Sequence, residues 1–218
     1  MKFGHSVVAS RGQPATAGHQ QPMRYVFEFE EALSFAVRLH AWQRRKLSDS
    51  PYVSHLLGVA SLVLEHGGGR DEAIAALLHD AIEDQAAEYP GGASALRAEI
   101  SRRFGPTVLD IVNACTDADS VPRPPWLERK QGFLARLVHV SDSARLVSCA
   151  DKLHNARSLV NDLRAMGREV LGRFAGGERG TLWYYGALAD AFVKLGPPRL
   201  ADELARTVVE LEGLTGKP

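Results

Sequence analysis

The fold is decided by one stretch of the chain, Ala75-Ala76-Leu77-Leu78-His79-Asp80-Ala81-Ile82-Glu83-Asp84. Its Ala- and Leu-rich composition favours an α-helix, in which successive residues are rotated by about 100°. With His79 taken as zero, Glu83 falls at about 40°, Asp80 at about 100° and Asp84 at about 140° on the helical wheel. The apolar residues fall between roughly 200° and 320°. One face is therefore expected to pack against a core, while the other presents an imidazole and three carboxylates.

That polar face carries an electrostatic conflict. Carboxylates three or four residues apart on a helix repel one another directly. A solvent-exposed acidic face tolerates the repulsion, but the flanking residues are too apolar for a surface helix. A bound cation removes the conflict, and His with Asp suits a divalent metal. The stretch alone leaves both interpretations open, because an adjacent pair is a weak motif.

Composition places the chain among ordinary globular proteins. It has 218 residues, of which 45% are hydrophobic, so it can bury a sizeable core. Lys plus Arg and Asp plus Glu each number 26, and the formal net charge is zero. This balance gives no electrostatic case for extensive nucleic-acid or membrane-surface binding. The two cysteines, Cys115 and Cys149, are expected to be reduced core thiols of a cytoplasmic protein.

The chain is expected to form a single domain after a disordered lead-in. Residues 1–22 are polar and rich in Gly, Pro, Gln and Ser, without the apolar segment of a signal peptide. No apolar run approaches the length of a membrane span. We therefore assign residues 23–218 to the domain.

Apolar spacing predicts an all-α helical bundle of about nine or ten helices. The expected helices are Phe27–Gln43, Pro51–Glu65, Asp71–Gln85, Leu96–Phe104, Thr107–Cys115, Trp126–Val140, Asp142–Ala165, Thr181–Leu195 and Arg199–Leu211. Ser50 and Pro51 look like an N-cap and a first helical residue, and Ser141 looks like a second N-cap. A polar, Pro-rich loop is expected from Thr116 to Pro125, and no strand pattern is convincing.

Two further residues on separate helices are candidate ligands. His55 lies on a strongly apolar helix, where a histidine is more often a satisfied core residue than a ligand. Asp151 follows Ala150 and precedes Lys152, so an ordinary ion pair is its alternative. A buried carboxylate needs a partner in either case. Ligands that lie far apart in sequence are typical of sites inside helical bundles.

Four segments, in order, resemble the HD-domain phosphohydrolases, and within them the (p)ppGpp hydrolase domain of the RelA/SpoT group. The family's HxxQxRK is matched by His40-Ala41-Trp42-Gln43-Arg44-Arg45-Lys46, and its PYxxH by Pro51-Tyr52-Val53-Ser54-His55. AALLHDxxED is matched by Ala75 to Asp84, and LADxxHN by Ala150-Asp151-Lys152-Leu153-His154-Asn155. The four together are a specific signature. Small stand-alone alarmone hydrolases, which lack a synthetase domain, look most similar.

The resemblance implies a metal site and a catalytic pair. Its four ligands would be His55, His79, Asp80 and Asp151, around one divalent ion that is usually Mn²⁺ in this group. Other divalent metals suit the same donors. Glu83 and Asp84 match the family's catalytic pair and would orient or deprotonate a metal-bound water. The resemblance also makes His154 a candidate partner of a ligand instead of a ligand.

The resemblance implies a nucleotide site as well. The positions that match substrate-binding positions of the family are Arg45, Lys46, Asn155 and Ser158, with Tyr184 as a further pocket residue. The competing explanation for the basic residues is the favourable placement of cations at a helix C-terminus. For Tyr184 it is an ordinary core aromatic. The chain has Leu47-Ser48 where the family commonly has Ser-Gly, which affects base recognition and not the metal chemistry.

The expected activity is therefore hydrolysis, without synthesis, of the 3′-pyrophosphate of (p)ppGpp, as in stringent-response alarmone degradation. One alternative keeps the site and changes the substrate to ppApp, the 2′-phosphate of NADPH or a pyrophosphorylated tRNA 3′ end. Net neutrality argues against the tRNA version. A second alternative is a non-catalytic nucleotide-binding module with a structural metal. The intact Glu83-Asp84 pair argues against that module, since a structural site does not require it.

Overall fold

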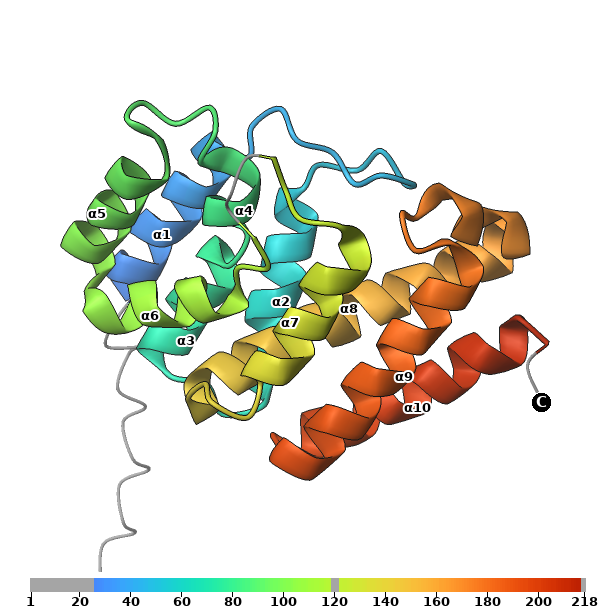
Figure 1. Ribbon diagram of the computed structural model, residues 1–218. Helices are drawn as coiled ribbons and strands as arrows, with labels where there is room; N and C mark the ends of the chain where they lie inside the picture. Colours follow the sequence, from blue (N-terminus) through green and yellow to red (C-terminus); the bar gives the residue numbers. More distant parts are fainter. Residues whose placement is uncertain (1–25, 119–121, 217–218) are drawn as a thin grey trace, which may run out of the picture.

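The computed structural model describes residues 26–118 and 122–216, and the expected lead-in, residues 1–22, lies outside them. Within these described residues, ten α-helices and one 3-10 helix follow one another (Figure 1). They are α1 (Val26–Leu39), α2 (Val53–Glu65), α3 (Arg70–Leu78), α4 (Ala81–Gln85), α5 (Gly92–Phe104), α6 (Pro106–Cys115), α7 (Trp126–Arg136), α8 (Asp142–Met166), η1 (Arg168–Arg173), α9 (Gly177–Leu195) and α10 (Pro198–Leu214). The all-α prediction is confirmed. Among the described residues the β pairing consists of one isolated bridge, between Arg44 and Pro51.

Helix α3 lies at the centre of the main core. Every residue from Ala73 to Leu78 is fully buried, because α1, α2, α6 and α8 all pack against this helix. A helix that is apolar on all sides is expected to be enclosed in this way. The long helix α8 then carries α9 and α10 on the other half of the molecule (Figure 1). The stretch from Ala75 to Asp84 therefore begins on a helix that is enclosed on all sides.

The predicted helix from Asp71 to Gln85 is wrong in one respect, because it is broken in two. Helix α3 ends at Leu78, His79 follows with helical angles, and Asp80 departs to φ −96° and ψ 0° before α4 begins at Ala81. The break changes the direction of the chain at the two candidate ligands. His79 is consequently buried, although the helical wheel placed it on an open polar face.

The segment from His40 to Tyr52 also differs from its prediction. Helix α1 ends at Leu39, before Gln43, so the basic residues that follow belong to a loop. Helix-terminal placement therefore does not explain Arg44, Arg45 and Lys46. Tyr52, and not Ser50, directly precedes α2, because the bridge between Arg44 and Pro51 holds position 51 extended. The Tyr52 amide donates to the Gln43 carbonyl at 3.0 Å and closes the loop.

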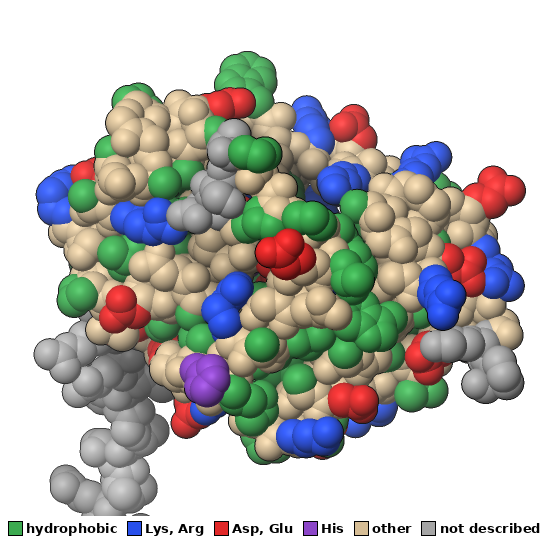
Figure 2. Space-filling view, viewed as in Figure 1, with side chains coloured by type: hydrophobic (Ala, Val, Ile, Leu, Met, Phe, Trp, Pro, Cys, Tyr) green, Lys and Arg blue, Asp and Glu red, His purple; other side chains and the backbone are tan. Residues whose placement is uncertain are grey.

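Other local predictions agree with the structure. The Ser141 side chain accepts from the Ala144 amide at 3.2 Å and caps α8. Cys115 and Cys149 are both buried and free. No helix among the described residues is long and apolar enough to cross a bilayer. On the face shown in Figure 2, basic and acidic side chains are interspersed, in keeping with the balanced charge.

Candidate metal centre and nucleotide cavity

His79 turns one ring nitrogen, Nε2, toward the site. Its Nδ1 lies 2.8 Å from the Ala76 carbonyl, one turn earlier on α3. A carbonyl only accepts, so Nδ1 donates to it, and Nε2 is the ring nitrogen that faces the carboxylates. Nε2 is buried and makes no hydrogen bond, although two carboxylate oxygens lie near it. An unpaired buried nitrogen of this kind is the arrangement that a metal ion completes.

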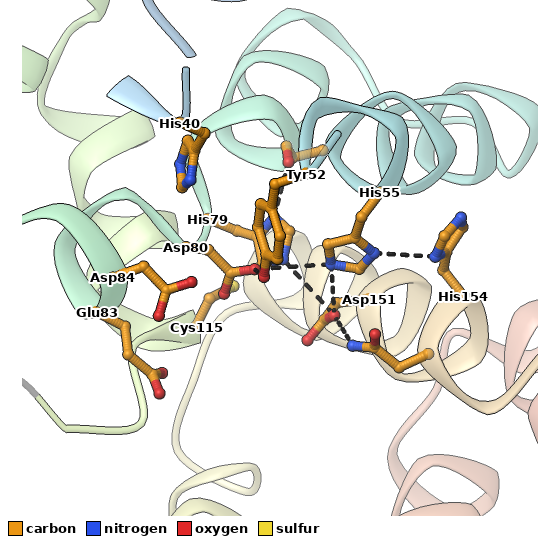
Figure 3. Close-up of polar contacts among 12 residues, drawn as sticks. His40, Tyr52, His55, His79, Asp80, Glu83, Asp84, Cys115, Asp151 and His154 are labelled. Atoms are coloured by element: carbon orange, nitrogen blue, oxygen red, sulfur yellow. Dashed lines mark hydrogen bonds and ion pairs between the residues drawn. The ribbon is translucent and has the colours of Figure 1, made fainter. Parts of the chain in front are cut away.

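The other three predicted ligands converge on the same point (Figure 3). His79 Nε2 lies 3.0 Å from Asp80 Oδ2 and 3.6 Å from Asp151 Oδ1. His55 Nε2, on α2, lies 3.2 Å from Asp151 Oδ1 and 3.6 Å from Asp80 Oδ2. His55 Nε2 is likewise buried and without a hydrogen bond. Three separate parts of the chain, α2, the α3–α4 break and α8, thus deliver four donor atoms to one place.

This donor set fits a divalent metal ion. Metal bonds to His and Asp are about 2.0–2.2 Å long, so neighbouring ligand atoms around one ion lie about 3–3.5 Å apart. Two imidazole nitrogens and two carboxylate oxygens suit several first-row divalent ions. Without the ion, burial disfavours a charged His79 ring, but Asp80 and Asp151 outweigh burial and raise the pKa of His79 well above its usual value. Metal binding at the site is therefore coupled to release of a proton.

Each ligand is held by a partner outside the donor set. The Tyr52 hydroxyl donates to Asp80 Oδ2 at 2.6 Å. His154 Nδ1 lies 2.9 Å from His55 Nδ1, so His154 contacts a predicted ligand. Burial and the neighbouring His55 lower the pKa of His154 to about 4, which keeps this ring neutral and able to accept. Such partners fix the orientation of the ligand rings and carboxylates.

Glu83 and Asp84 lie beside the donor set and are not among its closest atoms (Figure 3). Gln43 donates to Asp84 Oδ2 at 2.7 Å, and the Asp117 amide donates to Glu83 Oε2 at 3.2 Å. Burial, followed by the charge of Asp80, raises the pKa of both carboxyl groups. Arg123 pairs with Glu83 Oε1 at 3.4 Å. The two carboxylates are therefore positioned, partly buried and more basic than ordinary surface acids.

The five predicted nucleotide-binding residues all line one cavity of about 670 Å³, which also reaches Glu83 and Asp84. Arg45, in the loop before α2, donates to Asn155 Oδ1 of α8 at 2.9 Å. Lys46, Ser158 and Tyr184 complete the set. A cavity of this size can hold a nucleotide. The structure thus joins the predicted acidic and nucleotide-binding residues in one space.

Several residues of the site were not assigned from the sequence. Tyr52 belongs to the quoted PYxxH segment, whose tyrosine was given no role. Besides the basic residues of the loop before α2, four cations line the cavity, namely Arg123, Arg129, Lys130 and Lys152. Three of these, with Asp117, come from the Pro-rich loop and α7, where no motif was found. Of these residues, only Lys152 follows a candidate ligand, Asp151, in the sequence. An ordinary ion pair was the alternative interpretation there.

Comparison with known proteins agrees with this geometry. A family model described as an HD domain matches residues 32–176. The guanosine-3′,5′-bis(diphosphate) 3′-pyrophosphohydrolase MESH1 of Xenopus tropicalis is 40% identical over 132 residues, which cover 59% of this chain and 68% of that protein. The human MESH1 is 38% identical with the same coverage. A solved structure of a metazoan SpoT ortholog that hydrolyses ppGpp superposes with a TM-score of 0.69 at 25% identity, covering 90% of this chain and 99% of the other.

Proposed function

The chain belongs to the HD domain family, and from this membership we propose that it is a metal-dependent hydrolase that converts ppGpp or pppGpp to GDP or GTP and pyrophosphate. The observation that carries the proposal is the convergence of four donor atoms, two of which are histidine nitrogens without a hydrogen bond. Two further carboxylates, Glu83 and Asp84, lie beside them. The similar proteins named for this activity support the choice of substrate.

We assign the metal to His55, His79, Asp80 and Asp151. Among divalent ions we propose Mn²⁺, because mixed imidazole and carboxylate ligands suit it. When bound, such an ion lowers the pKa of a water molecule and polarises a phosphoryl oxygen. The Nε2 atoms of the two histidines already face the carboxylates, so the rings can hold the ion without rearrangement.

Glu83 and Asp84 are proposed to orient the attacking water and accept its proton. A base works best when its pKa is raised toward the working pH, and both carboxyl groups are shifted in that direction. Gln43 donates to one oxygen of Asp84, and the Asp117 amide donates to one oxygen of Glu83. Both carboxylates are therefore already oriented before the reaction begins. The 3′-oxygen of the ribose leaves, and the pyrophosphate keeps the oxygen from water.

The nucleotide is proposed to lie along Arg45, Lys46, Asn155 and Ser158, with Tyr184 in the wall. Arg45 is already oriented by Asn155, and a guanidinium can stack on a base or pair with phosphate. Lys46 is exposed at the cavity edge, where an ammonium can meet a phosphate. The partner is thus a small guanine nucleotide. Two reduced, buried cysteines fit the cytoplasmic location that we propose.

A turnover assay with the full chain tests this proposal. Incubation with Mn²⁺ and ppGpp should release GDP and pyrophosphate in equal amounts, and His79→Ala should remove both the activity and the bound metal. His66→Ala is the matched control, because His66 lies outside the centre and bonds the Leu62 carbonyl at 2.9 Å. The same assay with ppApp, NADPH and a pyrophosphorylated tRNA tests the substrate. Faster turnover of any of these than of ppGpp would overturn the choice of guanine nucleotide.

A further inference from the structure

Two lysines from different helices line the nucleotide cavity. Lys130 of α7 and Lys152 of α8 both line it, and their side chains are only 18% and 16% exposed. Ammonium groups are rarely buried to this extent unless anions face them. The resemblance assigned neither residue a role, and the reaction as described above does not use them.

Two carboxylates form hydrogen bonds with this group of cations. Lys130 Nζ bonds Asp117 Oδ2 at 2.8 Å, but Arg129 Nη1 bonds the same oxygen at 2.5 Å. Lys152 Nζ bonds Asp151 Oδ2 at 2.6 Å, and Asp151 also serves the metal centre. Three cations thus form hydrogen bonds with two carboxylates, one of which is also a proposed metal ligand. Burial and the charge of Lys152 lower the pKa of Lys130, whereas Asp117 and Glu83 act in the opposite direction.

A buried hydroxyl without a partner lies against the same cations. The Tyr184 hydroxyl makes no hydrogen bond, although the residue is only 6% exposed and lines the cavity. Lys130 Nζ lies 4.9 Å from the centre of the Tyr184 ring. A buried polar group in a native protein normally has a partner. An anion with several acceptor oxygens would satisfy the hydroxyl and both lysines together.

The same cluster contacts both a proposed metal ligand and a proposed catalytic carboxylate. Asp117 binds Lys130 through its side chain and Glu83 through its backbone amide, at 3.2 Å. Lys152 is tied to Asp151, whose other oxygen faces the two histidine nitrogens. An anion on the two lysines is therefore held beside the metal ligand and beside Glu83. This is where the diphosphate group must lie when its bond to the ribose is cleaved.

We propose that Lys130, together with Lys152 and the Tyr184 hydroxyl, binds the diphosphate group that the reaction releases, and that Asp117 is the positioning residue that fixes Lys130 relative to Glu83. The proposal rests on the proposed function for the identity of the substrate. Its physical content, a pyrophosphate site built from these three side chains, does not depend on turnover.

Binding of inorganic pyrophosphate to the Mn²⁺-loaded full chain tests the site directly, by calorimetry with Mn²⁺ in excess. Lys130→Met should weaken pyrophosphate binding by about tenfold or more, because it removes a charge-assisted hydrogen bond. Lys130→Arg should restore most of the affinity. Tyr184→Phe keeps the ring and should weaken binding several-fold. Lys194→Met is the matched control, since Lys194 is exposed on α9 outside this cavity, and it should change nothing.

Inhibition of ppGpp turnover by the two products separates the alternatives. In Lys130→Met, inhibition by pyrophosphate should weaken by the same factor while inhibition by GDP changes less than about twofold. Equal weakening for both products would assign Lys130 to the 5′-diphosphate and overturn the proposal. Unchanged pyrophosphate binding in both Lys130→Met and Tyr184→Phe would overturn it as well. If the wild-type chain binds pyrophosphate through Lys130 but does not hydrolyse ppGpp, the proposed function fails and this site stands.

Discussion

The ring of His154 occupies the space in which a side chain at Gly58 would begin. A Cβ built at Gly58 would lie 2.2 Å from His154 Nε2 and 2.3 Å from Cδ2, far inside van der Waals contact. His154 in turn meets His55 Nδ1 at 2.9 Å. The close packing of α2 on α8 at this glycine therefore sets the position of a metal ligand through one intermediate ring.

Replacing Gly58 by Ala should displace His154 and weaken the metal centre. Overpacking of this kind costs about 1–3 kcal/mol of stability, and loss of a ligand's partner reduces metal affinity by about tenfold or more. Metal content after dialysis and thermal unfolding measure the two effects. Gly186→Ala is the control, because nothing lies within 4 Å of a Cβ there and Ala favours a helix over Gly. Equal metal affinity in Gly58→Ala and wild type would contradict the role of His154.

Replacing Tyr52 by Phe removes only the hydroxyl oxygen and should impair the metal centre without disturbing the fold. The hydroxyl donates to Asp80 Oδ2 at 2.6 Å, and burial together with Asp80 raises the pKa of Tyr52, so it stays a donor at all working pH values. Tyr52→Phe leaves the ring stacked on His40. We expect a loss of about tenfold or more in kcat or metal affinity, with little change in Tm. A variant with normal kcat and normal metal affinity would show that Asp80 needs no such donor.

Most helices could be predicted from the sequence, because helical periodicity is local, and the four proposed ligands lie in segments that resemble a known family. It could not give the break at Asp80, since a helical wheel assumes a straight axis. Nor could it place the loop before α2, whose Arg45 bonds Asn155, 110 positions later. The role of Asp117 depends on an amide from a Pro-rich loop reaching Glu83. Contacts of that kind follow from packing and leave no periodic pattern.

The raised pKa of Glu83 predicts a pH-dependent cost to stability in the metal-free protein. Burial, then Asp80 and Asp117, raise this pKa, so the folded state holds the proton more tightly than the unfolded state, where an ordinary Glu has a pKa of about 4.3. Below that value both states are protonated and no cost arises. As pH rises toward the raised pKa, the unfolded state ionises first and stability is lost.

Glu83→Gln removes this cost along with the base. The variant should therefore be inactive, yet its Tm relative to wild type should increase between about pH 4 and pH 7 in the presence of a chelator. Melting curves of the two proteins across that range measure the difference directly. Glu99→Gln is the control. Arg102 lowers the pKa of Glu99, so the Tm of this variant relative to wild type should decrease with rising pH. A Glu83→Gln difference that shrinks with rising pH would contradict the burial of a charge at this position.

Metal binding should stabilise the fold, because the four ligands come from α2, α8 and the α3–α4 break, which separate on unfolding. Free metal at about 100 times its Kd contributes about 2.7 kcal/mol, which corresponds to a rise in Tm of roughly 5–10 °C for a chain of this size. A chelator should reverse the shift, and His79→Ala should abolish it, since the unpaired Nε2 is lost. His66→Ala should retain it, because His66 bonds the Leu62 carbonyl and Glu203 away from the centre. An equal Mn²⁺-induced shift in His79→Ala would place the metal elsewhere on the molecule and remove the basis for the proposed chemistry.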